Sequence, residues 1–236
     1  MFLLTALVVL IIIFLYAGVP YILSIVAKFL LARKVIKSKA IVLTFDDGPG
    51  TKLTPLILNI LAEYNVKATF FLLGRNISGR EEIVRQIAAA GHEICSHGYD
   101  HLNYLKVLPF HALADIKRGW QSIDSALGSN KGVYPFRPPF GRLNLVCLFY
   151  LWIRKVPIFY WTFDFGDAFS TSRPDVESIN ARLMGSGGAV VLLHDFDRTN
   201  ENKSNMVLEL GRTTLMQAKE NGMNVLTMSQ FLEENK

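Results

Sequence analysis

Seven short runs of apolar, β-favouring residues alternate along the chain with stretches that have the apolar spacing of helices. The runs are apolar at nearly every position, which is typical of strands covered on both faces in a parallel sheet or barrel. We therefore predict an α/β fold, a distorted (β/α)7 barrel. The predicted strands are 41–45, 67–72, 93–96, 133–136, 157–161, 189–193 and 223–228, and the predicted helices are 53–64, 80–90, 111–127, 143–154, 175–184 and 204–220.

The N-terminal segment, residues 1–27, contains no charged side chain. As a helix it would be about 40 Å long, against a hydrocarbon core of about 30 Å, so it can cross a bilayer with a tilt or a kink at Pro20. The apolar stretch is too long for a cleaved signal peptide, and no positive residue precedes it. We predict a single-pass transmembrane anchor at 1–27, a basic juxtamembrane segment at 28–39 and one folded domain at 40–236.

The positive charge of the chain is concentrated beside this anchor. The formal net charge is +5, from 25 Lys and Arg against 20 Asp and Glu, and five basic residues with no acidic one lie within 28–39. The rest of the chain is therefore neutral, so the excess would attract anionic membrane lipids, and nucleic-acid binding loses its support in the composition. Two cysteines indicate neither a disulfide framework nor a thiolate metal site.

Polar residues directly follow five of the predicted strands. In (β/α) barrels the carboxyl ends of the strands meet at one face, where the chemistry takes place. We therefore expect these side chains to converge on one mouth. They are Asp46 and Asp47, Ser96 and His97, Arg137, Asp164 and Asp167, and His194 and Asp195.

The spacing of His97 and His101 suggests a metal site, because residues four apart on a helical turn face the same way. Alone, such a pair also fits capping or core histidines. With a carboxylate from a neighbouring strand end it forms an Asp-His-His site for zinc or another divalent first-row metal. Such a metal lowers the pKa of a bound water and polarises a carbonyl. Of Asp46 and Asp47, one would bind the cation and the other would accept the proton of the water.

Five short motifs, taken together, resemble those of a known family. They are TFDDGP (44–49), SHGYDH (96–101), FRPPFG (136–141), WTFDFGD (161–167) and VLLHD (191–195). In this order they resemble the motifs of the polysaccharide deacetylase family, carbohydrate esterase family 4, also called the NodB homology domain. The resemblance extends from residue 41 to about residue 228. It implies that 40–236 is a catalytic domain.

The resemblance also assigns roles to the first three motifs. It implies that Asp46 is the general base and that Asp47, His97 and His101 hold the metal. Arg137 resembles the arginine that pairs with the base and orients it, and a charge-assisted contact of this kind keeps a carboxylate ionised. A surface salt bridge is the alternative for Arg137.

The remaining residues of the implied site come from the fifth, fourth and third motifs. His194 resembles the general acid that protonates the leaving amine, and Asp167 the carboxylate that holds it. A backbone N–H near Phe140 would help to bind the oxyanion. The family usually has Trp where this chain has Ala168, so we expect that one wall of the acyl pocket is either smaller or supplied by another residue. The acyl group expected first is acetyl, and formyl is the second candidate. Asp164 fits a strand-end cap and a functional residue equally well.

The resemblance implies a hydrolase of amide bonds, a carbohydrate de-N-acetylase that acts on a lipid-linked amino sugar or on a cell-envelope glycan. An O-acetyl esterase would use the same site. An inactive carbohydrate-binding scaffold would be expected only if the ligands or the base were missing. Relatives that act on wall polysaccharides suggest an external domain, but the basic residues after the anchor favour the cytoplasmic face, and with it a polyprenyl-linked sugar.

The predicted helix at 143–153 has no charged residue, although a surface helix should have a polar face. It fits either a covered core helix or a surface that dips into the membrane between Arg142 and the pair Arg154 and Lys155.

Overall fold

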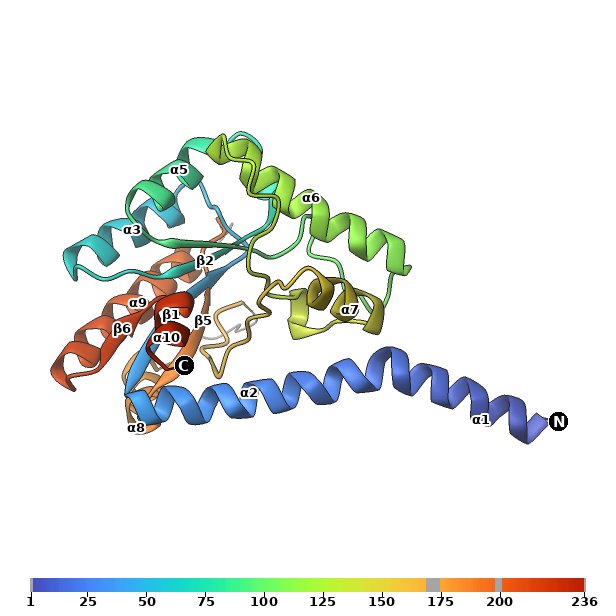
Figure 1. Ribbon diagram of the computed structural model, residues 1–236. Helices are drawn as coiled ribbons and strands as arrows, with labels where there is room; N and C mark the ends of the chain where they lie inside the picture. Colours follow the sequence, from blue (N-terminus) through green and yellow to red (C-terminus); the bar gives the residue numbers. More distant parts are fainter. Residues whose placement is uncertain (1, 169–174, 198–200, 236) are drawn as a thin grey trace.

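A computed structural model describes residues 2–168, 175–197 and 201–235. Its centre is a six-stranded sheet in which every strand pair is parallel, surrounded by helices (Figure 1). This confirms the predicted α/β class. The strands are β1 (Ala40–Asp46), β2 (Thr69–Leu72), β3 (Glu93–Ser96), β4 (Phe163–Asp164), β5 (Ala189–His194) and β6 (Asn224–Leu226).

The strand pairings close into a distorted barrel. The sheet has the order β3-β2-β1-β5-β4, and single bridges join Ser96 to Phe136 and Phe136 to Ile158. Ile158 lies just before β4 in the chain, so the circuit of pairings returns to its start. Two predicted strands, 133–136 and 157–161, are reduced to these bridges. Pro135 and Pro157 lie beside them, and proline cannot donate to a strand ladder.

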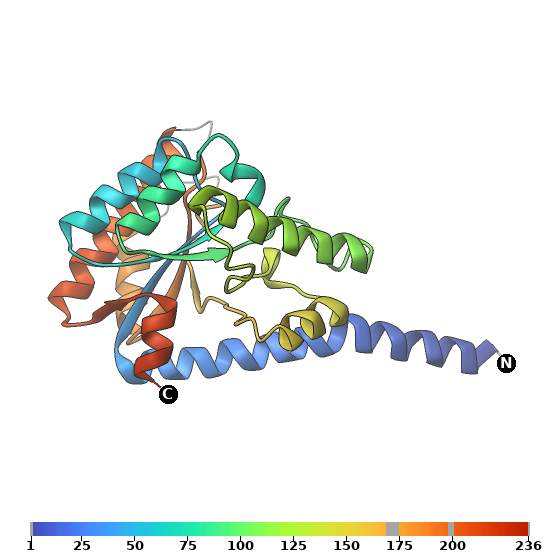
Figure 2. The ribbon, with the colours of Figure 1, turned by 45° about the horizontal axis from the view of Figure 1, so that its top comes forward.

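Helices cover the outside of this barrel (Figures 1 and 2). All six predicted helices are present, with bounds close to those expected. They are α3 (Leu53–Glu63), α5 (Glu81–Ala89), α6 (Pro109–Leu127), α7 (Leu145–Ile153), α8 (Val176–Gly185) and α9 (Glu201–Glu220). The structure adds the short α4 (Gly74–Ile77), a 3-10 turn η2 (Pro139–Gly141) and a C-terminal α10 (Met228–Glu234).

Alternation along the strands separates the barrel interior from its outer face. Val42 and Val190 belong to a small inner cluster, whereas their neighbours Leu43 and Val191 belong to the main core beneath the helices. Val35 and Phe231, from the N-terminal and C-terminal helices, complete the inner cluster. The interior at the amino ends of the strands is therefore filled with apolar side chains, which leaves the carboxyl ends for polar ones.

The N-terminal segment is one long helix, formed by α1 (Phe2–Ile13), a π-helical turn η1 (Phe14–Gly18) and α2 (Val19–Ser38). By length and composition it can cross a membrane. The helix continues through the basic residues and ends at Lys39, which has a left-handed backbone conformation. The second half packs along the domain and buries Pro20, Ser24 and Val35, while α1 projects away from it (Figure 1).

Candidate active site

The period of two along β1 brings Asp46 into the mouth of the barrel. Val42, Thr44 and Asp46 alternate with the outward Leu43 and Phe45, so all three face inward. Arg137, which is fully buried, lies across this face. Its Nη1 donates to Asp46 Oδ1 at 2.6 Å and to Thr44 Oγ1 at 2.8 Å. Arg137 is thus a buried partner of Asp46, and the surface salt bridge considered for it is wrong.

Two opposing effects act on the Asp46 carboxyl. Burial raises its pKa above the ordinary value, and the Arg137 guanidinium acts against this rise. The Arg137 contact occupies Oδ1, and Oδ2 faces the imidazole of His97 at 3.7 Å from Nε2. A carboxylate with a raised pKa and one free oxygen can accept a proton on that oxygen. The role of Asp46 as general base stays a prediction.

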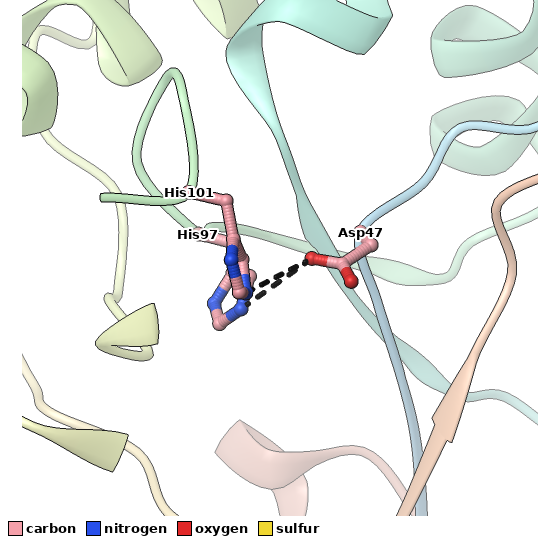
Figure 3. A group of neighbouring side chains, drawn as sticks. All are labelled: Asp47, His97 and His101. Carbon is pink, nitrogen blue, oxygen red and sulfur yellow. Dashed lines mark ion pairs between the residues drawn. The ribbon is translucent and has the colours of Figure 1, made fainter. Parts of the chain in front are cut away.

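Asp47, His97 and His101 come together at the end of β1 and in the loop after β3 (Figure 3). Asp47 Oδ1 lies 3.6 Å from His97 Nε2 and 3.5 Å from His101 Nε2. Metal–ligand bonds of about 2.1 Å place neighbouring ligand atoms roughly 3.0 to 3.4 Å apart, close to these separations. Asp47 Oδ1 is buried and has no hydrogen-bond partner among the described residues. The three residues therefore fit a divalent cation.

The protonation of His97 also fits metal ligation. Its Nδ1 lies 2.8 Å from the backbone carbonyl of Arg137, which can only accept, so Nδ1 must carry the hydrogen. Burial lowers the pKa of His97 to about 3, so the ring is neutral and Nε2 has a free lone pair. A backbone carbonyl that fixes the tautomer of a histidine is a usual partner of metal ligands.

Several residues of the mouth have unusual backbone conformations. Asp47, His101 and Phe140 have φ values of 70°, 57° and 58°, in the left-handed region that non-glycine residues seldom occupy. At Asp47 this conformation separates the directions of two adjacent carboxylates, so that Asp46 meets Arg137 and Asp47 meets the histidines. Such outliers gather at functional sites because the surrounding structure holds them there.

His194 ends β5 beside the buried Asp167. His194 Nδ1 lies 2.9 Å from Asp167 Oδ1, and the backbone N–H of His194 donates to Asp167 Oδ2 at 3.2 Å. Burial lowers the pKa of His194, but the hydrogen bond and charge of Asp167 outweigh it and raise the pKa to about 9. The ring is therefore protonated at neutral pH, as a general acid must be, although this role too stays a prediction.

Phe140 packs its ring against His101, with the centroids 4.5 Å apart, and its side chain is 49% exposed. The Phe140 side chain therefore lies beside His101, and the oxyanion contact of its backbone N–H stays a prediction. Asp164 is exposed and accepts the backbone N–H of Gly166 at 2.7 Å, so it caps its own turn. Ala168 is half-buried next to Asp167.

Asp195 is a buried residue of the site to which the sequence analysis gave no role. Its Oδ2 accepts the hydroxyl of Thr54 at 2.6 Å, and its backbone N–H donates to Asp46 O at 3.1 Å. The carboxylate lies directly against Gly48, where a Cβ atom would overlap it. Asp195 therefore supports the turn that carries Asp47. The position of Asp195 directly after His194 was the only sign of this in the sequence.

Comparison with known proteins gives the same family as the motifs. The family model for polysaccharide deacetylase matches residues 33–150. A peptidoglycan-N-acetylglucosamine deacetylase of Bacillus cereus is 30% identical over 196 residues, which are 82% of this chain and 88% of that protein. The chain belongs to the polysaccharide deacetylase family. A chitooligosaccharide deacetylase of a Bradyrhizobium species is 29% identical over 169 residues, 71% of this chain and 75% of that protein.

Solved structures of polysaccharide deacetylases share the fold. The Bc1960 peptidoglycan N-acetylglucosamine deacetylase superposes with a TM-score of 0.74 at 28% identity, covering 82% of this chain and 88% of that chain. A CE4 family pseudoenzyme from Bacillus anthracis superposes with a TM-score of 0.71 at 27% identity, covering 84% and 66%. Membership of this family therefore does not by itself establish activity, and the site must be judged on its own residues.

The matched region is only part of some relatives. Against the peptidoglycan-N-acetylglucosamine deacetylase PgdA of Listeria monocytogenes, this chain is 29% identical over 203 residues. These residues are 85% of this chain but 40% of the Listeria protein. The activity of such a longer relative comes to this chain only as a proposal.

Proposed function

We propose that the chain is a divalent-metal-dependent carbohydrate de-N-acetylase, which hydrolyses the amide of an N-acetylated amino sugar to a free amine and acetate. One observation carries the proposal. The buried, unpartnered Oδ1 of Asp47 faces two imidazole nitrogens, next to a carboxylate that is itself held by a buried arginine. The second pair, His194 and Asp167, completes the set of groups that hydrolysis requires.

A cation on Asp47, His97 and His101 would lower the pKa of water and polarise the amide carbonyl. The N/O ligands suit zinc first and other divalent first-row metals second. The chain's own residues then move the protons. Asp46 accepts the proton of the attacking water on Oδ2, because Arg137 holds Oδ1.

The second proton goes to the leaving nitrogen. His194 directs Nδ1 at Asp167, so Nε2 carries the proton that is transferred. Asp167 keeps the ring charged until the C–N bond breaks, and its two contacts with His194 fix the orientation of the ring. Phe140, through its backbone N–H, is proposed to bind the oxyanion.

The proposed substrate is a glycan or lipid-linked sugar that contains N-acetylglucosamine or a similar amino sugar. Relatives of this chain are named peptidoglycan-N-acetylglucosamine deacetylase and chitooligosaccharide deacetylase, which supports this class. Ala168, a small residue, leaves room beside Asp167 and keeps N-formyl groups as a second acyl class. An O-acetyl ester is the alternative substrate, since its carbonyl would meet the same groups.

The proposal is tested with purified full-length chain in detergent. Peptidoglycan, chitooligosaccharides, N-formylglucosamine oligomers and O-acetylated glycans are supplied in parallel, and released amine and carboxylate are quantified. We expect amine release from N-acetylated substrates, and release at least about 10²-fold slower from the Asp46→Asn control. Release of acetate from esters alone would make the protein an esterase. No release from any substrate, with cation bound, would favour an inactive scaffold.

We further propose that the N-terminal helix anchors the enzyme in the membrane and that a lipid-linked sugar is its substrate. A pocket of about 340 Å³ lies between α2 and the η2 loop, lined by Tyr21 and Ser24 on one side and by Gly141 and Arg142 on the other. Lys28, on the same face of α2, lies 4.0 Å from the ring centre of Trp161. The positive charges of Lys28 and Arg142 beside this pocket suit the phosphate of a lipid carrier.

The side of the membrane is part of this proposal. The basic residues 28–39 favour the cytoplasmic face. Fusions to the C-terminus of one reporter active only in the cytoplasm and one active only outside it test this directly. Signal from the external reporter alone would exclude the cytoplasmic arrangement and favour a wall glycan as substrate.

A further inference from the structure

We propose that the outer face of α7 is immersed in the lipid leaflet beside the anchor, so that the domain itself enters the membrane surface. We call this the α7 face, formed by Leu145, Val146, Phe149, Trp152 and Ile153. The inference rests on the anchoring proposed above. It assigns a partner, the acyl region of a bilayer, to a surface of the domain.

The α7 face is apolar and uncovered. Cys147 and Leu151 turn the opposite side of α7 into the core, whereas Phe149 and Trp152 are 57% and 70% exposed. A helix that is apolar on all sides is normally buried on all sides. Within the described part of the chain, nothing covers this side of α7.

The position of α7 identifies what covers it. In both views α7 lies beside the bend between α1 and α2, and it contacts η1 and α2 (Figures 1 and 2). The α7 face is therefore next to the apolar segment that would cross the membrane. A lipid surface is already present there if the anchor is inserted.

The length of the free helix shows how deep the domain must sit. The domain packs against the helix from Ala17, which lines the pocket at the η2 loop, to the buried Val35. Residues 2–15 of the helix are exposed, which is about 21 Å of helix at 1.5 Å per residue. If the hydrocarbon core is about 30 Å thick, roughly 9 Å of it must lie beside the domain. Interfacial helices enter a bilayer by about 5–10 Å, so this depth is the one expected for the α7 face.

The ends of α7 carry the charges that such a position requires. Arg142 precedes the helix, and Arg154 and Lys155 follow it, all exposed. Cations at the rim of an apolar face attract anionic headgroups, and exposed tryptophan favours the membrane interface. The η2 loop with Phe140 leads directly into α7, so immersion would place the mouth of the active site at the membrane surface.

Trp152 provides a probe for the test, because Trp120 is buried and Trp161 is partly buried. The full-length chain is reconstituted into vesicles of phosphatidylcholine and phosphatidylglycerol that contain lipids brominated at defined depths. We expect strong quenching of tryptophan fluorescence by bromine just below the headgroups, lost in Trp152→Phe. A second variant, Trp152→Phe with Leu56→Trp, moves the exposed tryptophan to α3, on the far side of the domain, and should remain unquenched.

Alkaline extraction of the same vesicles separates this inference from the anchoring. If the protein stays in the membrane but Trp152 is not quenched, the α7 face does not enter the lipid and the inference is wrong. Trp152 shielded from both bromolipid and aqueous acrylamide would mean that a protein covers α7, and would equally overturn it. Release of the protein by alkali would show that the anchoring proposal itself has failed.

Discussion

The pairing of His194 with Asp167 predicts a specific change in the pH dependence of the reaction. Asp167→Asn keeps an oxygen that can accept from His194 Nδ1 but removes the negative charge. Burial lowers the pKa of His194, and the hydrogen bond and charge of Asp167, with the charges of Asp46 and Asp47, overcome it and raise the pKa to about 9. Without the Asp167 charge, burial is opposed by fewer groups, so the pKa should fall toward its ordinary value of 6.5.

The size of the effect follows from these values. With a pKa of about 9, roughly 90% of His194 is protonated at pH 8, whereas a pKa of about 6.5 leaves roughly 3%. A rate that requires protonated His194 should therefore fall by up to about 30-fold at pH 8 from this cause alone. The alkaline limb of kcat/KM, which we expect near pH 9 in the wild type, should move down by up to about 2.5 pH units.

The assay is the pH profile of kcat/KM for amine release between pH 5 and pH 10. Asp164→Asn is the matched control, because Asp164 lies in the same segment but is exposed and caps a turn. The control should keep the wild-type limb. If Asp167→Asn lowers the rate equally at every pH and leaves the limb near pH 9, Asp167 does not set the charge of His194 and the assignment is refuted.

Three further substitutions test the remaining parts of the site. Asp46→Asn should retain the cation and lose about 10²-fold or more of the rate, as expected for a lost general base; near-normal turnover would exclude the role. Arg137→Met leaves the buried Asp46 charge without its partner, so the free energy of unfolding should fall by about 3–5 kcal/mol. Chemical denaturation measures this change, and an unchanged free energy of unfolding would contradict the pairing. Gly48→Ala would press a methyl group against Asp195 and displace the turn that carries Asp47. The free energy of metal binding should therefore fall by more than the free energy of unfolding does. An unaltered metal affinity would show that this turn does not position Asp47 as a ligand.

Much of the architecture could be predicted because the strands obey simple rules. Apolar runs covered on both faces indicated a barrel, and the polar residues directly after them indicated where the strands end. Along β1 the period of two then carries Asp46 to the interior, so its place at the mouth follows from Val42 and Thr44. The pairing circuit closes as the predicted barrel requires.

The site depends on details that a strand pattern does not contain. The direction of the Asp47 side chain depends on the left-handed backbone of Asp47, and residue type alone does not specify that conformation. Asp195 was expected at the mouth, but its role beneath the turn was not foreseen, because a carboxylate in that position has no spacing signature. Its contact with Gly48 exists only in the folded barrel.

Some elements had signals in the sequence that were not used. Thr227 and Gln230 form a capping box that begins α10, and this spacing is readable before a short helix. The continuation of α2 past Ala27 was harder to foresee, because Arg33, Lys34 and Lys37 face solvent whereas Val35 packs into the inner cluster. For α7, an uncharged helix allowed two interpretations, and its exposed Trp152 excludes a fully covered core helix.

The central claim is that Asp47, His97 and His101 hold one divalent cation on which hydrolysis depends. It is tested most directly by removing metal from the purified chain and titrating zinc back while measuring bound metal and amine release together. We predict that activity returns in proportion to bound zinc and stops rising at one equivalent, and that His101→Ala loses both. Activity that persists without metal, or a wild-type chain that binds none, would contradict the account.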